Sequence, residues 1–411
     1  MEERVILHCD CNSFFASVET ALNPAYKNVP MAVCGSTEDR RGIVLAKNEL
    51  AKKYNIQTAE TVFSAKKKCP SLVIVSPHHE AYQEYSKKAN DIYKRFTDLV
   101  EPFGIDESWL DVTKSQKLFG NGFEIAKKIS ECIKSELGIT VSIGVSFNKV
   151  FAKLGSDYKK PDAITVISRE NYKELTYKLP VSMLLFVGKK TEESLLKLGI
   201  KTIGALAESS EAILVSKLGK AGETLYRYAT GEDDSPVSPN AHEDSKSISN
   251  GITFRHDLTT IEEYKTGIDF LSEEIGTRLR AKNLKCATVQ LTIKDEYLRS
   301  IQRQKPQSPP SDIGSEIAAT AFDILKSEWN FGKPIRMLTV SATNIMRADS
   351  LSEQISMFSQ SDDEKRKKAR ESEKTIDKIR QKFGRSSIIK GAALNTDIGI
   401  YEAPKKNIDK N

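Results

Sequence analysis

The chain contains 411 residues, of which 39% are apolar and 29% are charged, and its net charge is +6. This composition excludes a chain that is disordered throughout and indicates two to four folded domains of roughly 100–200 residues each. No stretch approaches the ~18 apolar residues that a membrane span needs, and the first residues do not resemble a signal peptide. The six cysteines form no CxxC pair. We therefore expect reduced thiols in a cytoplasmic protein without membrane contact.

Strands and helices are predicted to alternate over roughly the first 165 residues. The first strand ends at Asp10, and helical spacing follows from Ser13 to Leu22. Further strands are predicted near 42–46, 105–113 and 139–145, and further helices near 49–54, 80–99 and 123–137. Because helices that alternate with strands pack onto a sheet, this region is predicted to be an α/β core.

The remainder of the chain divides into segments with different patterns. Residues 168–233 are predicted to be helical, and the turn-forming residues after Gly231 are typical of a linker. Residues 247–345 show a strand, helix, strand, strand, helix, strand order, and eight basic residues lie between Arg278 and Lys305 against two acidic ones. The charged run from Asp362 to Lys382 is predicted to be a solvated helix rather than a site.

Two groups of acidic residues follow or interrupt predicted strands. Asp10 ends the first strand, and the pair Asp106 and Glu107 lies about 96 residues later. Carboxylates at strand ends can meet in space and bind divalent cations, and their hard oxygen atoms favour Mg²⁺ or Mn²⁺. The alternative is that each carboxylate is solvated or paired with a lysine.

A rival metal cluster is suggested by His8, Cys9 and Cys11. Side chains alternate along a strand, so Cys9 and Cys11 face one side while His8 and Asp10 face the other. These residues therefore cannot all bind one ion, and a zinc site is not expected here.

Three longer segments contain or follow the acidic residues. They are residues 7–19 (LHCDCNSFFASVE), 104–111 (GIDESWLD) and 142–157 (SIGVSFNKVFAKLGSD), the last followed by Lys160 and Pro161. In order and spacing they resemble the motifs of the Y-family translesion DNA polymerases, in the Gram-positive type of the DNA polymerase IV and UmuC-like group. The resemblance covers residues 1 to about 346 and is strongest over the first 165.

The resemblance implies an α+β right-hand fold. A palm with a ferredoxin-like α/β sheet is expected at 1–11 and 78–167, with small fingers at 12–77 and a helical thumb at 168–233. A linker at 234–246 would lead to an α/β little finger at 247–346. The tail at 347–411 is expected to contain a peptide that binds the sliding clamp.

The same resemblance assigns the catalytic metal site. Asp10, Asp106 and Glu107 are implied to bind two Mg²⁺ ions, with Mn²⁺ as a possible substitute, and the backbone carbonyl of Cys11 is implied as a further ligand. Attack of a primer 3′-hydroxyl on the α-phosphate builds negative charge on oxygen atoms, which two cations can stabilise.

Aromatic and apolar residues are implied to line the nucleotide site. Phe15 matches the steric gate, whose ring excludes a ribose 2′-hydroxyl, and Phe14 is assigned to the same nucleotide-binding set. For both residues the alternative is an ordinary position in the core. Leu45 matches the roof over the nascent base pair, where relatives usually have a small residue, so we expect small or abasic lesions to be handled better than bulky adducts.

Basic residues are implied to bind the triphosphate. Lys160 matches a lysine that contacts phosphate in the family. Lys52 matches a position that is often arginine, so it retains the charge without the bidentate geometry. Glu49 departs from the pattern, because a carboxylate pointing inward there would repel phosphate.

Three regions are expected to hold macromolecular partners. Residues 187–191 with Leu198, Gly199 and Ile200 resemble a helix-hairpin-helix that binds a DNA phosphate, although Phe186 replaces a frequent glycine and a plain helix turn is the alternative. The basic stretch between Arg278 and Lys305 suits contact with the DNA backbone, or is a solvated sheet face. In the tail, the segment that includes Gln354, Met357 and Phe358 resembles the peptide that binds the bacterial sliding clamp.

The resemblance as a whole implies an error-prone, template-directed DNA polymerase. It would add dNTPs to primer–template DNA during translesion synthesis, as a monomer with the clamp as partner. Three alternatives remain open. They are a catalytically silent DNA- and clamp-binding subunit, an enzyme that needs a partner subunit, and a nucleotidyl cyclase with a similar palm.

Overall fold

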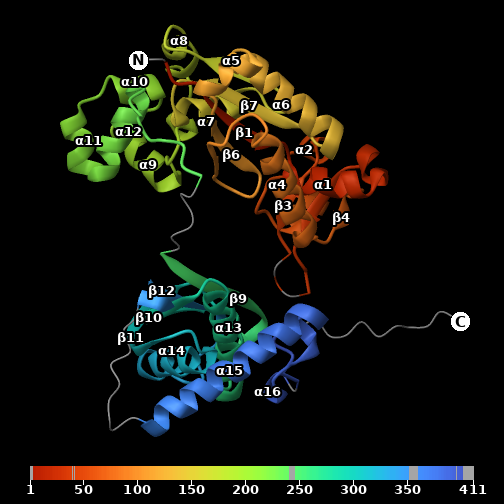
Figure 1. Cartoon of the computed structure of the whole chain (residues 1–411), viewed down its shortest axis with the longest axis vertical. Coiled ribbons are helices and arrows are strands. Elements are labelled where there is room, and N and C mark those ends of the chain that lie inside the picture. The colour runs from red at the N-terminus through yellow and green to blue at the C-terminus, as the bar shows by residue number, and fades with distance from the viewer. Residues whose placement is uncertain are drawn as a thin grey trace, which may run out of the picture. The chain divides into compact units, whose positions relative to one another are not determined.

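The computed structural model describes residues 3–38, 40, 42–239, 246–350, 360–394 and 396–400 (Figure 1). Two compact units are present: Met1–Gly35 with Ile43–Glu243, and Ser36–Gly42 with Asp244–Asn411. Both units combine helices with sheets, which confirms the predicted α+β class. In the described part of the chain, no helix has the length and apolarity needed to cross a membrane.

A five-stranded sheet forms the centre of the first unit. Its strand order is β5-β6-β1-β7-β8, with β1 antiparallel to both neighbours and β7 parallel to β8. The strands are β1 (Ile6–Cys11), β5 (Val100–Pro102), β6 (Glu107–Asp111), β7 (Val141–Ser146) and β8 (Ile164–Ile167). Every residue of β1 is buried, because this central strand is covered on both faces.

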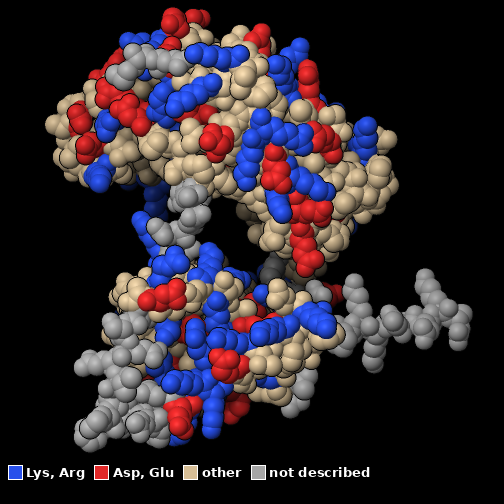
Figure 2. All heavy atoms as spheres, in the orientation of Figure 1, with Lys and Arg blue, Asp and Glu red and all other residues tan. Residues whose placement is uncertain are grey.

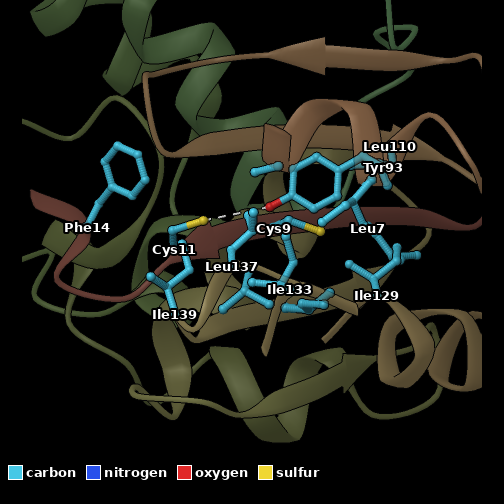
Figure 3. Packing of buried hydrophobic residues seen from close by; sticks show 14 of the residues in the cluster. Leu7, Cys9, Cys11, Phe14, Tyr93, Leu110, Ile129, Ile133, Leu137 and Ile139 are labelled. Carbon is cyan, nitrogen blue, oxygen red and sulfur yellow. Dashed lines mark hydrogen bonds between the residues drawn. The ribbon is translucent and has the colours of Figure 1, made fainter. Parts of the chain in front are cut away.

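Side chains of β1 alternate between the two faces of that sheet. Cys9 and Cys11 join a core cluster with residues of α4 (His79–Tyr93) and α6 (Gly122–Leu137). Figure 3 shows these two thiols among the labelled apolar side chains, with Cys11 Sγ 3.8 Å from the Tyr93 hydroxyl. His8 and Asp10 lie on the opposite face, as the alternation predicts.

Helix α7 (Lys149–Tyr158) covers the face with His8 and Asp10. Gly144 in β7 and Gly155 in α7 allow the two backbones to approach closely. A Cβ atom on Gly144 would lie 1.9 Å from the Ala152 carbonyl oxygen, and one on Gly155 would lie 3.0 Å from the Gly144 Cα. Glycine at these two positions therefore fixes how near α7 lies to the sheet.

Two predicted boundaries in this unit were wrong. The helix predicted over 80–99 ends at Tyr93, because Arg95 N–H and Phe96 N–H bond three residues back and tighten the turn. The strand predicted from residue 105 begins only at Glu107. The N–H groups of Phe103 and Gly104 both donate to the Glu107 carbonyl, so Asp106 lies in a tight turn before β6.

A smaller sheet in the first unit has the order β3-β2-β4, with β2 (Met31–Cys34), β3 (Val44–Lys47) and β4 (Val73–Val75). The surrounding helices are α1 (Phe14–Leu22), η1 (Pro24–Asn28), α2 (Glu49–Lys52) and α3 (Val62–Lys68). Asn48 caps α2 by accepting from the Ala51 N–H, and Thr61 caps α3 in the same way. Two short elements, η2 (Thr113–Ser115) and α5 (Gln116–Phe119), precede α6.

Residues 168–233 were predicted to be helical, and the structure confirms this prediction. This segment contains α8 (Tyr172–Thr176), η3 (Val181–Met183), α9 (Lys189–Lys197), α10 (Ile203–Ala207), α11 (Glu211–Leu218) and α12 (Lys220–Thr230). Their apolar residues share one core cluster with Phe147, which precedes α7, and with Phe151 in its first turn.

The second unit shows the predicted strand and helix order. Its four-stranded sheet has the order β11-β10-β12-β9, and all neighbours are antiparallel. The elements are β9 (Ser247–Leu258), α13 (Ile261–Ala281), β10 (Leu284–Asp295), β11 (Ser300–Ser311), α14 (Gly314–Glu328) and β12 (Ile335–Arg347). Residues from both helices and all strands except β11 fill one buried cluster.

The tail of the second unit contains η4 (Ala348–Ser350), α15 (Gln360–Phe383), η5 (Arg385–Ser387) and α16 (Gly391–Leu394). The helix predicted for the charged run from Asp362 to Lys382 is confirmed. The prediction that this helix is surrounded by solvent was wrong. Arg370 pairs with Asp312 at 2.6 Å, and Glu373 accepts from the N–H groups of Gly314 and Ser315 at the start of α14. One face of α15 is therefore fixed to the unit by ion pairs and a helix cap.

Candidate active site

Asp10 and Glu107 are directly opposite each other in the ladder between β1 and β6. Together with His8 they form a group whose nearest ligand atoms all lie within 4.8 Å of one another. Asp10 is 5% exposed, so its carboxylate is nearly removed from water. The pairing of a strand end with a strand start thus brings together two of the three predicted metal-binding carboxylates.

Asp106 lies in the turn beside this pair, and its carbonyl accepts from the Cys11 N–H at 3.0 Å. Burial raises the pKa of Asp106 to about 6, and the charges of Asp10 and Glu107 act in the same direction. Because its negative neighbours disfavour the charged form of Asp106, this carboxylate gains from binding a cation. The donor set of three carboxylates and main-chain oxygen atoms fits a hard ion such as Mg²⁺.

His8 is the residue in this group that sequence reasoning did not assign. Its Nε2 lies 3.3 Å from Glu107 Oε2, and its Nδ1 lies 2.8 Å from Ser156 Oγ. Burial lowers the pKa of His8 and opposes its protonation, although Glu107 acts in the other direction. The placement of His8 on the same face as Asp10 was the available signal.

Two lysines meet the carboxylates from α7 and the loop after it. Lys160 Nζ lies 2.7 Å from Asp10 Oδ2, so the predicted triphosphate-binding lysine is beside the predicted metal site. Lys153 Nζ lies 3.1 Å from Asp10 Oδ2 and 3.1 Å from Glu107 Oε2. Burial opposes the ionisation of Glu107, but the contacts with His8 and Lys153 outweigh it and lower its pKa to about 2.

Phe15 is half-buried on α1, and its ring stacks on Tyr82 at a centroid distance of 4.2 Å. The Tyr82 hydroxyl donates to the buried Glu19 carboxylate, which also contacts His78 Nδ1 at 2.8 Å. These contacts fix the position of the predicted gate. Phe14 is 3% exposed and belongs to the main core cluster, so its ring has the core position that was the alternative.

The predicted triphosphate residues of the smaller sheet region lie near the start of α1. Lys52 pairs with Glu49 at 2.5 Å, and the Ser13 hydroxyl donates to the same Glu49 oxygen at 3.3 Å. Glu49 therefore neutralises Lys52 in the free protein. Leu45, the predicted roof residue, is half-buried in β3.

The predicted DNA-binding regions are only partly free of ion pairs. In the predicted hairpin, Gly188 is the N-cap of α9, and Phe186 is exposed with a φ of 68°. In the basic stretch, at least four of the eight basic residues have acidic partners among the described residues, so its +6 charge overstates the free positive charge. These pairs are Arg280 with Glu373 and Asp377, Arg299 with Asp295, Arg303 with Glu328, and Lys305 with Asp323. The predicted clamp-binding residues Gln354, Met357 and Phe358 lie outside the described residues.

Comparison with known proteins gives consistent results. A sequence model of the impB/mucB/samB family matches residues 9–157, and that of the family's C-terminal domain matches residues 245–357. The chain is similar to DNA polymerase IV of Acetivibrio thermocellus, with 50% identity over 393 residues, which is 95% of this chain and 98% of the relative. It is also similar to DNA polymerase IV 1 of Bacillus subtilis, with 34% identity over 396 residues, which is 96% and 94% of the two chains.

A solved structure shares the fold. A Y-family DNA polymerase chimera superposes with a TM-score of 0.73 over 84% of this chain and 99% of that chain, at 24% identity. At that identity the likeness concerns the fold alone.

Proposed function

We propose a template-directed, error-prone polymerase activity for this chain, which belongs to the DNA polymerase IV group of the Y-family DNA polymerases. The members of this family are DNA-directed DNA polymerases. This chain would extend a primer 3′-hydroxyl with dNTPs on primer–template DNA, including past damaged template bases. The observation that supports this most is the pairing of Asp10 with Glu107 across β1 and β6, with Asp106 and Lys160 beside them.

Asp10, Asp106, Glu107 and the Cys11 carbonyl would hold two Mg²⁺ ions. When bound, such ions lower the pKa of the attacking hydroxyl and stabilise the leaving pyrophosphate. The protein's own contribution is to hold Asp10 and the Cys11 carbonyl on the buried strand β1, with Glu107 at the start of β6 and Asp106 in the turn before it. In this partly buried setting electrostatic attraction is stronger than in water.

Other residues would bind and select the nucleotide. Lys160 would exchange its contact with Asp10 for the triphosphate, and Lys52 would leave Glu49 in the same way. The ring of Phe15, supported by Tyr82, would lie against the sugar and exclude a 2′-hydroxyl. Leu45 would limit the space above the nascent base pair.

Primer extension with Mg²⁺ tests the proposal. The parent should extend an undamaged primer–template with dNTPs and refuse rNTPs, while Asp106→Ala should lose extension by about 10³-fold or more. Asp91→Ala, which removes an exposed aspartate of α4, is the matched control and should behave as the parent. Phe15→Ala should accept rNTPs and retain dNTP extension.

Two results would contradict parts of this proposal. If the folded parent does not extend the primer until cell extract is added, a partner-dependent enzyme is indicated. If it never extends the primer, the silent DNA-binding alternative is indicated.

A further inference from the structure

Lys153 has an unusual position for a lysine, because its ammonium group is surrounded by three carboxylates. Its Nζ lies 3.1 Å from Asp10, 3.1 Å from Glu107 and 3.2 Å from Asp157, and its side chain is 15% exposed. The first two carboxylates are those proposed to hold the divalent cations. The third, Asp157, is one turn further along α7 and has no assigned role.

The packing of α7 dictates this position. Gly144 and Gly155 bring the helix so near to β7 that the side chains on its inner face reach the carboxylates on β1 and β6. Lys153 and Asp157 are four residues apart, so both are on this face. The long side chain of Lys153 then places its ammonium group between Asp10 on β1, Glu107 on β6 and Asp157 in the next turn of α7.

An ammonium at this point competes with a divalent cation. Lys153 and Lys160 both contact Asp10 Oδ2, and Lys153 also occupies Glu107 Oε2. A second positive charge within about 4 Å would be repelled in a partly buried site, because the protein screens charges less than water does. Divalent cations can therefore bind these oxygen atoms well only after the ammonium groups have moved.

Asp157 offers both lysines another partner. Its carboxylate lies 3.2 Å from Lys153 Nζ and 2.8 Å from Lys160 Nζ, and it is 33% exposed, which leaves room for the lysines to move outward. A shift toward Asp157 would keep each ammonium paired, so neither charge would be left uncompensated in a partly buried site.

We propose that Lys153 is the resident counter-ion of the metal site and that Asp157 receives it when divalent cations bind. In the metal-free protein Lys153 would neutralise Asp10 and Glu107 and keep them close together. On metal binding it would remain on α7 and pair with Asp157. This inference rests on the proposed function, because it takes Asp10 and Glu107 as metal ligands.

The proposal gives two variants with effects of opposite sign. Lys153→Met removes the competing charge and should tighten cation binding by about fivefold. Asp157→Asn removes the alternative partner and should weaken cation binding by a similar factor. A residue with a merely structural role would weaken binding in both variants.

Binding of Mn²⁺ can be measured directly by electron paramagnetic resonance of the free ion. The full chain is titrated in complex with a primer–template that has a dideoxy-terminated primer and with a dNTP that cannot be hydrolysed, so no turnover occurs. Lys159→Met is the matched control. It removes the same charge from an exposed lysine near the end of α7 and should leave the affinity unchanged. Thermal unfolding of each variant checks that the unit is intact.

Each outcome decides the matter. Tighter binding by Lys153→Met together with weaker binding by Asp157→Asn supports the proposal. Unchanged or weaker binding by a folded Lys153→Met overturns it while the proposed metal site stands. If the parent binds no Mn²⁺ above the level of Asp106→Ala, the proposed metal site itself is contradicted and this inference with it.

Discussion

Glu49 and Lys52 illustrate how single residues adjust the nucleotide site. Their ion pair at 2.5 Å is exposed and lies near Ser13 at the start of α1. A triphosphate must break this pair to recruit Lys52. We predict that Glu49→Gln lowers the KM for dNTPs by up to about fivefold, which corresponds to the ~1 kcal/mol upper range for an exposed ion pair.

Steady-state extension with a single dNTP measures this effect. Glu84→Gln breaks a comparable exposed pair with Lys88 on α4 and should leave KM unchanged. A higher KM for Glu49→Gln than for the parent would show that the carboxylate assists binding instead of opposing it.

Phe186 holds a backbone conformation that favours glycine. Its φ is 68° and the residue is 62% exposed, so it gains little from burial. Because glycine adopts this region without a Cβ clash, we predict that Phe186→Gly is more stable than Phe186→Ala by about 1 kcal/mol. Comparing glycine with alanine isolates the backbone contribution, because both variants lack the ring.

The matched control is the same pair of substitutions at Phe63, an exposed residue inside α3. There the order should reverse, with alanine more stable than glycine, because the backbone is helical. Denaturant unfolding of the four variants gives the comparison. The same order at both positions would contradict the account of Phe186.

Residue-level prediction from the sequence succeeded where periodicity determines direction. Alternation along β1 correctly separated Cys9 and Cys11 from His8 and Asp10. Periodicity could not reveal the ion pair between Glu49 and Lys52. Both side chains are long and exposed, so each can adopt several rotamers, and only some of these bring the two charges together. The contacts of Lys153 were missed because they depend on how closely α7 packs on β7.

Helix α15 shows what element-level patterns cannot reveal. Its charged sequence correctly predicted a helix, yet its partners Asp312 and Arg280 are about 60 to 100 residues away in sequence. Nothing in the local pattern indicates that Asp312 is fully buried or that Arg280 is only 6% exposed. Figure 2 shows many lysine and arginine side chains over this helix, and the packing decides which of them are paired.

Arg370 is predicted to be essential for the stability of the second unit. It contacts both oxygen atoms of the buried Asp312 carboxylate, at 2.6 to 3.0 Å. We predict that Arg370→Met lowers the free energy of unfolding of this unit by about 3–5 kcal/mol, because it leaves a buried charge without its partner. Adding Asp312→Asn should recover part of the loss, since the unpaired charge is then absent.

The two tryptophans allow the measurement in the full chain. Trp109 lies in the first unit and Trp329 in the second, so a Trp109→Phe background leaves one fluorescent reporter in the second unit. Lys374→Met, which breaks the exposed pair with Glu371 on the same helix, should leave the midpoint unchanged. Equal midpoints for Arg370→Met and Lys374→Met would show that the pair between Arg370 and Asp312 does not stabilise this unit.

At the scale of the whole molecule, the order of strands and helices could be predicted from the sequence, but the structural contribution of the tail could not. The strand and helix order of the second unit follows from its alternating patterns, because six consecutive segments each match one period. The palm, fingers and thumb boundaries stay predictions from the resemblance. The sequence also did not show that the tail contributes structure as well as the expected clamp peptide.

The structural role of the tail and its predicted clamp-binding role can be tested separately. Met357→Ala with Phe358→Ala should abolish the stimulation of primer extension by a loaded sliding clamp, a gain of ~10-fold or more that arises from tethering. Extension without the clamp should be unchanged, as should the unfolding of the second unit.

Truncation after Ser350 removes α15 as well, so it should lose the clamp response and also destabilise the second unit. Lys367→Ala with Lys368→Ala, two exposed lysines of α15, is the control that should keep both properties. If the Met357 and Phe358 variant still responds to the clamp, the contact with the clamp is made by another part of the chain.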